Sequence, residues 1–490
     1  MLCYGYNEAI FASAKPNRKE IFKMSEYSYD IVVLGAGPGG YECAIRCAQY
    51  GKKVALVEVR ELGGTCLNRG CIPTKALLHG AEMFEAAKSA ADCGVTLGEV
   101  GFDFAKLAEY KDGVVNKLRT GIAGLEKAHG VKVIKGFGKV VDAHTLSVEN
   151  DGSTEEITFD KLILATGSSP ARPPIPGIDG ENIVTSDEIL SMNELPESFV
   201  IIGGGVIGIE FATLFSTLGK PVTVIEMMPS ILPGVDADIV RVLGRVLKKK
   251  KVTVINNAKV TGIEGGSTVC VKYELNGEEK TAEGACCVVS VGRRAQTSNI
   301  GLEALGIEMN RAFVNIDEHC RTNIENIYAI GDITGKIQLA HVATAQGFVA
   351  AANACGIKEE KMDYSIVPSC IYTSPEIAFV GLSEDKAKEQ GIEYKLGSYN
   401  VAGNGRAMIM GDAMGTAKLI ADNSGKLLGA QLMCPRATDM IAELALALKM
   451  GANIEDIVNT IHPHPTVSEV VAEAAHDYEG LCCHALPKKK

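Results

Sequence analysis

Apolar positions near the start of the chain form two patterns, separated by a glycine-rich segment. Residues 29–34 are almost continuously apolar, which is typical of a buried parallel strand. Gly35, Gly37 and Gly40 follow, and apolar residues then recur with helical spacing before a further apolar run ends at Glu58. The pattern therefore predicts a strand, a tight turn, a helix and a second strand.

The same pattern occurs a second time. An apolar run at 199–202 precedes Gly203, Gly205 and Gly208, and another apolar run ends at Glu226. Each landmark lies 168 residues after its counterpart in the first copy. An internal repeat at one fixed offset predicts two equivalent α/β units.

Both units have the features of a dinucleotide-binding turn. In such a turn the first glycine permits a tight bend, the second lets the backbone approach a pyrophosphate, and the third lets the helix pack close to the strand. The acid lies 18 residues past the last glycine in both copies, where a carboxylate can accept hydrogen bonds from ribose hydroxyls. A glycine-rich turn without a ligand is the alternative, and the two copies at one offset disfavour it.

Glu226 also bears on the choice of nicotinamide cofactor. Its carboxylate would repel the 2′-phosphate of NADP, and the next residues are Met227 and Met228 rather than arginine. The second unit is therefore expected to bind NAD.

Two cysteines, Cys66 and Cys71, follow the first unit directly, and Lys75 comes four residues after the second cysteine. A helix start, predicted here, and a nearby cation both lower the pKa of a thiol. Buried structural thiols and half of a zinc site are the alternatives, but a zinc site would need two further ligands at short spacing, and none is nearby. The pair is interpreted as a redox dithiol.

Two dinucleotide sites beside a dithiol indicate a chain of two-electron carriers. NAD exchanges hydride, a dithiol gives up electrons as thiolates, and a flavin can exchange with both. FAD is therefore expected at the first unit, next to the cysteines, and NAD at the second.

The segment at 63–75, Gly-Gly-Thr-Cys-Leu-Asn-Arg-Gly-Cys-Ile-Pro-Thr-Lys, resembles the redox motif of the pyridine nucleotide–disulfide oxidoreductases. The resemblance extends over about residues 27–480 and implies an α/β fold with two Rossmann-like dinucleotide-binding domains and a C-terminal α/β dimerisation domain. The expected ranges are 25–165 and 295–360 for a discontinuous FAD domain, 166–294 for an inserted NAD domain, 361–480 for the dimerisation domain, and 1–24 and 481–490 for flexible tails.

The resemblance also implies roles for single residues. Cys66 would exchange with the substrate sulfur atoms, Cys71 would make a charge-transfer contact with the flavin, and Lys75 would lie near the reactive edge of the flavin. Glu210 would face the nicotinamide side, and Asp332 would hold the ribityl chain. The expected FAD residues are Gly35, Gly37, Gly40, Glu58, Gly64, Thr65, Lys75, Thr166, Gly167, Asp332, Leu339, Ala340 and His341. The expected NAD residues are Gly203, Gly205, Gly208, Glu210, Glu226 and Gly292.

A catalytic base is expected at 461–469, which read Ile-His-Pro-His-Pro-Thr-Val-Ser-Glu. Dithiol oxidation needs a base because the thiolate is the reacting species, and a histidine can exchange a thiol proton at neutral pH. Pro465 favours an extended His464 and a helix start, which would place Glu469 in the first turn, able to fix the imidazole. A capped helix start with solvated histidines is the alternative for the segment alone. Similarity to the family signature His-Pro-Thr-x-x-Glu favours His464 as base and Glu469 as its partner, with His462 a structural neighbour.

In the resembling family the base comes from the second subunit, so the resemblance implies a homodimer with shared active sites. The implied substrate is a dihydrolipoyl group on a separate lipoyl-bearing protein, oxidised with NAD⁺; the parent complex stays open between 2-oxoacid dehydrogenase and glycine cleavage systems. Glutathione or mercuric reductase activity is the alternative among enzymes. A non-catalytic flavoprotein is the alternative of another class, and the intact catalytic set disfavours it.

The composition of the chain disfavours some classes of partner and favours one type of compartment. The net charge of −11 disfavours a nucleic-acid partner, and no apolar stretch approaches the ~20 residues of a membrane span. Fifteen cysteines are too few for a secreted disulfide scaffold and favour a reducing compartment, which is the cytoplasm, or the mitochondrial matrix in a eukaryote. Residues 1–24 are interpreted as a disordered extension or as a start assigned too early.

Other signals are discounted. Cys482 and Cys483 resemble the C-terminal cysteine pair of mercuric reductase, but the residues after them differ from the short ending of that family, and no metal site is expected. The segment 384–387 is similar to a lipoyl attachment site, but Ser383 resembles an N-cap with acids in the first turn. The lysines at 248–251 are expected to complement a helix C-terminus.

Overall fold

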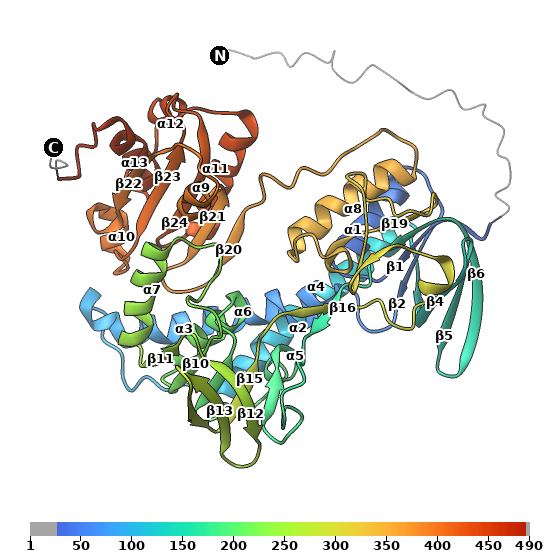
Figure 1. Cartoon of the computed structure of the whole chain (residues 1–490), viewed down its shortest axis with the longest axis horizontal. Helices are drawn as coiled ribbons and strands as arrows, with labels where there is room; N and C mark the ends of the chain where they lie inside the picture. Colours follow the sequence, from blue (N-terminus) through green and yellow to red (C-terminus); the bar gives the residue numbers. More distant parts are fainter. Residues whose placement is uncertain (1–26, 487–490) are drawn as a thin grey trace.

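The computed structural model describes residues 27–486, which form three lobes. The lobe at the right of Figure 1 holds the first glycine-rich unit, the lower lobe holds the second, and the upper-left lobe holds the C-terminal part. The expected α/β fold is confirmed. The expectation for 1–24 lies outside the described residues.

The first lobe holds the unit expected to bind FAD and is named the FAD domain for that reason. It is built on a parallel sheet in the order β3–β2–β1–β6–β19. The strands are β1 Tyr29–Leu34, β2 Val54–Glu58, β3 Lys132–Lys135, β6 Ser153–Leu164 and β19 Ile327–Ala329. The start of β6 also pairs with an antiparallel hairpin of β4 (Phe137–Asp142) and β5 (Thr145–Asn150). Two helices, α1 (Pro38–Gln49) and α8 (Ala340–Ala354), pack against each other over this sheet.

The second lobe holds the unit expected to bind NAD, is named the NAD domain for that reason, and repeats this design. Its parallel sheet has the order β11–β10–β9–β15–β8, so β11, β10, β9 and β15 correspond to β3, β2, β1 and β6. The strands are β8 Ile183–Thr185, β9 Phe199–Ile202, β10 Val222–Ile225, β11 Val252–Ile255 and β15 Cys286–Val289, with an antiparallel sheet of β12 Lys259–Glu264, β13 Val269–Leu275 and β14 Glu278–Gly284. The repeat predicted from the offset is therefore also a repeat in topology.

The core of the NAD domain fixes its glycine-rich helix, α6 (Val206–Thr217). Residues 208–217 of α6 are all buried, because the helix lies between its sheet and α3 (Cys71–Ser89). The rings of Phe199 and Phe215 stack with centroids 3.8 Å apart. Burying such a side chain contributes roughly 1.5–3 kcal/mol, and this contact holds the last turn of α6 against β9.

The connections between the lobes bring the segments of the site together. Where the chain leaves and re-enters the FAD domain, β7 (Ser168–Pro170) pairs with β16 (Arg293–Ala295). The remaining helices of these two lobes are α2 Gly64–Arg69, α4 Phe104–Ala128, α5 Ser186–Ile189 and α7 Ala237–Lys249. The end of α7 at Lys249 agrees with the expectation for the lysines at 248–251.

The third lobe corresponds to the expected dimerisation domain and takes that name. It has an antiparallel sheet in the order β20–β21–β24–β23–β22. Its elements are β20 Ser369–Ile371, β21 Ile377–Gly381, α9 Glu384–Glu389, β22 Lys395–Asn400, α10 Gly405–Ile409, β23 Thr416–Ala421, β24 Leu427–Met433, α11 Ala437–Met450, α12 Ile454–Val458 and α13 Glu469–Glu479. Ser383 caps α9, as predicted, by accepting the backbone N–H of Lys386.

Of the tail expected at 481–490, the structure describes residues 481–486. Gly480, in the left-handed conformation, ends α13 and reverses the chain. The Cys482 thiol then donates to Glu473 at 2.9 Å, and His484 Nδ1 lies 2.6 Å from the same carboxylate. This part of the C-terminus therefore packs along α13.

Candidate functional site

The first glycine-rich turn has the geometry of a phosphate-binding loop. Gly35 has φ +105°, a conformation that only glycine adopts readily. A Cβ on Gly40 would lie 1.9 Å from the carbonyl oxygen of Gly35, so the helix can approach the strand only because this residue lacks a side chain. The Glu58 carboxylate accepts the backbone N–H groups of Ala36 and Arg60, both at 2.7 Å, and so closes the turn.

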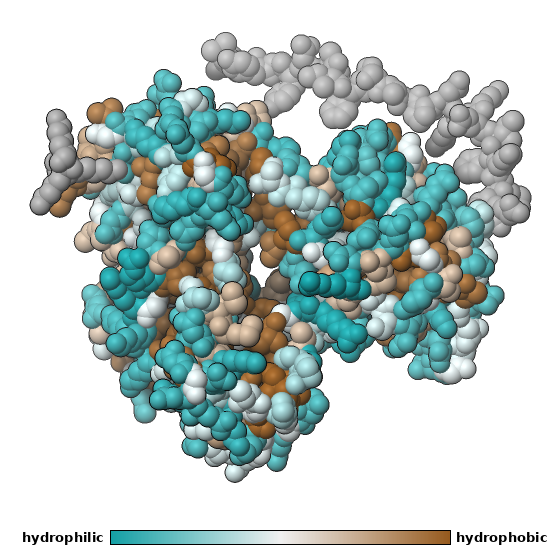
Figure 2. Space-filling model, in the orientation of Figure 1, coloured by the Kyte–Doolittle hydropathy of each residue, from teal (hydrophilic) through white to brown (hydrophobic). Residues whose placement is uncertain are grey.

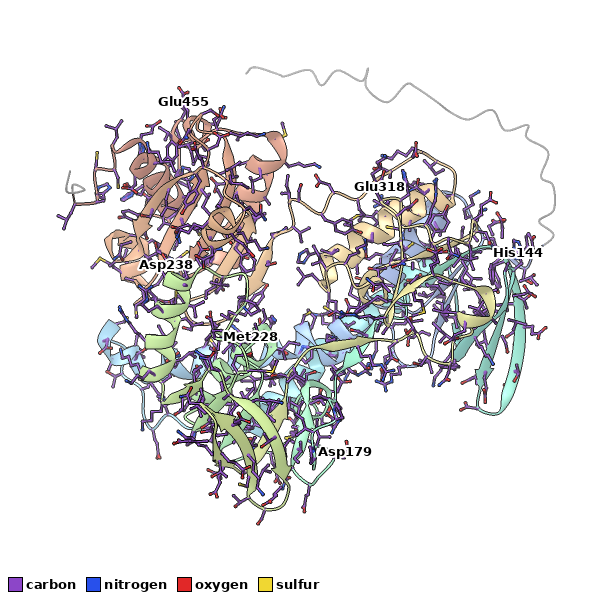
Figure 3. The ribbon with its side chains drawn as sticks, viewed as in Figure 1. His144, Asp179, Met228, Asp238, Glu318 and Glu455 are labelled. Carbon is purple, nitrogen blue, oxygen red and sulfur yellow. The ribbon has the colours of Figure 1, made fainter. Side chains whose placement is uncertain are left out.

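The second turn reproduces each of these features. Gly203 has φ +108°, and a Cβ on Gly208 would lie 2.1 Å from the carbonyl oxygen of Gly203. The Glu226 carboxylate accepts the backbone N–H groups of Gly204 at 2.5 Å and of Met228 at 2.6 Å; Met228 is labelled in Figure 3. The two acids thus occupy equivalent positions beside their turns.

One cavity of about 1680 Å³ joins the two turns. Figure 2 shows the surface hollowed where the lobes meet, with hydrophobic residues around the hollow. Every residue expected to contact FAD or NAD lines this cavity except Gly208, which packs against Gly203 instead.

The middle glycines provide a test of whether dinucleotides fit. Gly37 and Gly205 are the N-caps of α1 and α6, and no atom beyond the adjacent residues lies within 4 Å of the point where a Cβ would stand on either. Both line the cavity, so each helix N-terminus opens onto free space next to its N–H groups. This is the cradle that a pyrophosphate requires, and the residues fit FAD at the first turn and NAD at the second.

The two cysteines lie where helices begin. Cys66 is in the short helix α2, and Cys71 is the first residue of α3; both are free thiols that line the cavity. The hydrogen bond from Cys66 and the charge of Lys75 lower the pKa of Cys71 to about 7, although burial opposes the shift. The same hydrogen bond and burial raise the pKa of Cys66. In the reduced pair, therefore, Cys71 loses its proton more readily than Cys66 does.

Lys75 forms an ion pair that crosses between the two nucleotide-binding domains. Its Nζ lies 2.9 and 2.8 Å from the two carboxylate oxygens of Glu210, on α6. Glu210 is buried, with a side chain 5% exposed, so the pair is a fixed charge arrangement between the dithiol and the second turn.

Asp332 is held in the cavity by side chains that were not predicted. The Ser168 hydroxyl donates to Asp332, and Arg293 donates to the hydroxyl and the carbonyl of Ser168 at 2.7 and 2.8 Å. Sequence reasoning missed Ser168 and Arg293 because they meet only through the pairing of β7 with β16, and no local spacing marks them. Leu339 is the N-cap of α8, so Ala340 and His341 stand at a helix start beside the cavity.

His464 and Glu469 form a hydrogen-bonded pair away from the cavity lining. Glu469 accepts from His464 Nδ1 at 2.8 Å and from the backbone N–H of Thr466 at 2.9 Å. The helix does not begin at Pro465 as expected; the His464–Pro465 peptide is cis, and α13 begins at Glu469. The His464 side chain is 79% exposed, whereas His462 is buried against Glu443 of α11 at 2.9 Å.

The described residues, 27–486, contain no helix long and apolar enough to cross a membrane. Within the same range, no three or more histidine, cysteine or acidic side chains are arranged to hold a metal ion.

Comparisons with known proteins identify the family. The sequence model described as pyridine nucleotide-disulphide oxidoreductase matches residues 29–347, and that of its dimerisation domain matches residues 367–475. The dihydrolipoyl dehydrogenase of Geobacillus stearothermophilus is 43% identical over 463 residues, which cover 94% of this chain and 98% of the relative. That of Chlorobaculum tepidum is 39% identical and covers 92% of this chain and 97% of the relative.

Solved structures of flavoprotein disulfide reductases and related proteins have the same fold as this chain. LpdA from Mycobacterium tuberculosis superposes with a TM-score of 0.85 at 28% identity, covering 91% of this chain and 99% of LpdA. The HOCl-induced flavoprotein disulfide reductase RclA from Escherichia coli gives a TM-score of 0.82 at 31% identity, covering 90% and 98%.

These relatives confirm the expected class of enzyme and its cofactors, FAD and NAD, and the dimerisation domain indicates a homodimer. The function is that of a dihydrolipoyl dehydrogenase, an NAD-dependent oxidoreductase. The chain belongs to the pyridine nucleotide-disulphide oxidoreductase family.

Proposed function

We propose that the chain oxidises dihydrolipoyl groups carried on a separate protein, with each active site shared between two subunits. The shared active site is supported by one observation. The dithiol lies inside the cavity, whereas His464 and Glu469 lie on the dimerisation domain and do not line the cavity. An exposed imidazole held by a carboxylate has no partner thiol in its own cavity, and a second copy of the chain can supply one.

His464 is the proposed base. Glu469 holds Nδ1, which leaves Nε2 to accept the proton of a substrate thiol. The substrate thiolate then attacks Cys66 of the Cys66–Cys71 disulfide, and Cys71 leaves as a thiolate beside Lys75. The second substrate thiol attacks the mixed disulfide, which closes the lipoyl ring and releases Cys66.

Bound FAD would accept the electron pair of the dithiol, and NAD⁺ would receive it as hydride. Gly37, Glu58 and Asp332 are proposed to hold FAD, with Gly205 and Glu226 holding NAD. Glu210 would hold Lys75 in an ion pair between the two sites.

The proposed partner is a lipoyl-bearing protein of a 2-oxoacid dehydrogenase or glycine cleavage system. The dithiol chemistry of its prosthetic group matches the redox pair of the cavity. The domain ranges 25–165 with 295–360, 166–294 and 361–480 are also proposed, and the pairing of β7 with β16 at the two inner boundaries supports them.

Mixed dimers test the shared site. Neither Cys66→Ser nor His464→Gln homodimers should turn over. A mixed dimer would have one complete site, so random association of equal amounts should restore about a quarter of the wild-type activity. If co-assembled chains stay inactive although mixed dimers are isolated, the base serves its own chain and the proposal is wrong.

A further inference from the structure

Tyr372 reaches the Lys75–Glu210 pair from the dimerisation domain. It follows strand β20, lines the cavity, and donates its backbone N–H to Glu210 Oε1 at 3.1 Å. Its ring lies against Lys75, with Nζ 4.5 Å from the ring centroid. A single residue of the third lobe therefore contacts both members of an ion pair that joins the first two lobes.

The ring contact restricts a side chain that is otherwise flexible. Lysine has a four-carbon stem and a compact charge, so one carboxylate fixes the distance of Nζ but not its direction. Glu210 holds Lys75 from one side and the ring of Tyr372 faces it from another. An ammonium group over an aromatic ring is attracted by the electrons of the ring face.

Tyr372 is itself anchored at the start of α11. The Thr438 side chain, in the first turn of α11, neighbours the Tyr372 side chain and acts on its hydroxyl. Glu376 fixes Thr438 by accepting its backbone N–H at 2.9 Å and its hydroxyl at 2.7 Å. The thiol of Cys370, on the same strand segment, donates to the Thr438 carbonyl at 3.8 Å. The position of the ring is thus set by the dimerisation domain.

Three side chains act on the Cys71 thiolate. The Cys66 thiol donates a hydrogen bond to it, Lys75 brings a positive charge, and Glu210 brings a negative charge. The charge on Cys71 therefore depends on where Nζ of Lys75 is held.

We propose that Tyr372 is a positioning residue, which holds Lys75 beside Cys71 and so sets how readily Cys71 exists as a thiolate. The inference rests on the proposed roles of Cys71 and Lys75. It makes the dimerisation domain part of the electrostatics of the redox centre.

The test uses the FAD-loaded dimer after two-electron reduction. The long-wavelength absorbance that a thiolate produces next to a flavin is titrated with pH, and its midpoint reports the ionisation of Cys71. Tyr372→Phe keeps the ring and should leave the midpoint unchanged. Tyr372→Leu should raise the midpoint, so that the thiolate fraction at a given pH falls roughly tenfold.

A fluorinated ring separates charge from shape. Replacement of Tyr372 by pentafluorophenylalanine nearly keeps the volume of the ring but reverses the charge of its face, and should therefore raise the midpoint. This variant also provides the test if Tyr372→Leu does not fold. Tyr478→Leu is the matched control, because Tyr478 also lies under a lysine, Lys395 at 4.3 Å, but does not line the cavity. It should leave the midpoint unchanged.

An unchanged midpoint with the fluorinated ring overturns the inference. Equal shifts with Tyr372→Phe and the fluorinated ring also overturn it, since the hydroxyl would then be the active group. Failure of the proposed function is distinguishable, because wild-type enzyme would then not oxidise dihydrolipoamide whatever the variants did.

Discussion

The burial of Lys418 leads to a quantitative prediction about how two domains are joined. Lys418, on β23, has a side chain only 2% exposed, and its Nζ lies 2.8 Å from Asp236, 3.0 Å from Asp238 and 2.8 Å from Glu384. Asp236 and Asp238 belong to the start of α7, and Figure 3 shows Asp238 where this helix meets the dimerisation domain. Lys418→Met keeps the length of the side chain and removes its charge.

The expected destabilisation follows from burial. Asp236 is also only 2% exposed, so the substitution leaves a buried carboxylate without its cation. Removing one partner of a buried ion pair costs roughly 3–5 kcal/mol. The matched control is Lys388→Met, which removes a lysine that contacts the same Glu384 at 2.7 Å but is 58% exposed. An exposed pair contributes about 0–1 kcal/mol, so the control should be nearly neutral.

An acidic pH should reduce the loss of unfolding free energy that Lys418→Met causes. Burial raises the pKa of Glu384, but hydrogen bonds from Lys388, Lys418 and Tyr394 outweigh it and lower that pKa from 4.5 to about 2. A carboxylate with a depressed folded pKa contributes stability that is complete above its unfolded pKa and is lost as the pH falls through the folded value. Without Lys418 the Glu384 carboxylate protonates more easily, so the loss of stability should be largest near neutrality and shrink below about pH 4.5.

Two measurements check this prediction. Denaturant unfolding at neutral and acidic pH gives the difference in free energy between each variant and wild type. Hydrogen exchange at the start of α7 and along β23 shows whether the loss is local to the contact between the domains. A deficit no larger than that of Lys388→Met, or one that grows in acid, would refute the reasoning.

Three further substitutions test the site. Gly40→Ala places a Cβ 1.9 Å from a backbone oxygen and should destabilise the FAD domain by roughly 1–3 kcal/mol and lower the flavin content of purified protein; full flavin retention would contradict this. Glu226→Ala removes both the acceptor of two N–H groups and the repulsion of a 2′-phosphate, so the ratio of kcat/KM for NADH over NADPH should fall by at least about tenfold; an unchanged ratio would count against its role. Glu469→Gln removes the charge that orients His464 and should lower kcat by tenfold or more with little change in dimer stability, so wild-type turnover would exclude it as a partner.

The parts of the fold that repeat, or that depend on glycine, could be predicted from the sequence. Gly35 and Gly203 are recognisable because the backbone needs a positive φ there, and Gly40 and Gly208 because a Cβ would strike the preceding turn. These constraints act within about six residues, so they leave a local pattern. The two parallel sheets also share one strand order over four strands, which agrees with the predicted repeat of two equivalent units.

The contacts between domains have no local pattern in the sequence from which they could be predicted. Arg293 with Ser168, Tyr372 with Lys75, and Lys418 with Asp236 each join distant segments through the tertiary fold. Lys418 lies in a strand in which a lysine normally indicates a solvent-facing position, and only the three carboxylates around it explain its burial. The packing of 481–486 along α13 was missed for the same reason, because Glu473 is an ordinary helical glutamate until the chain turns back onto it.

The most direct test of the central claim is a set of steady-state rates for the purified dimer. Dihydrolipoamide, glutathione disulfide and Hg²⁺ are each offered with both nicotinamide cofactors, and Cys71→Ser serves as the control without a redox pair. Rapid NAD⁺-dependent oxidation of dihydrolipoamide, abolished by Cys71→Ser, is the result expected. Preferred turnover of glutathione disulfide or Hg²⁺ with NADPH would contradict the assignment of this cavity to dihydrolipoyl chemistry.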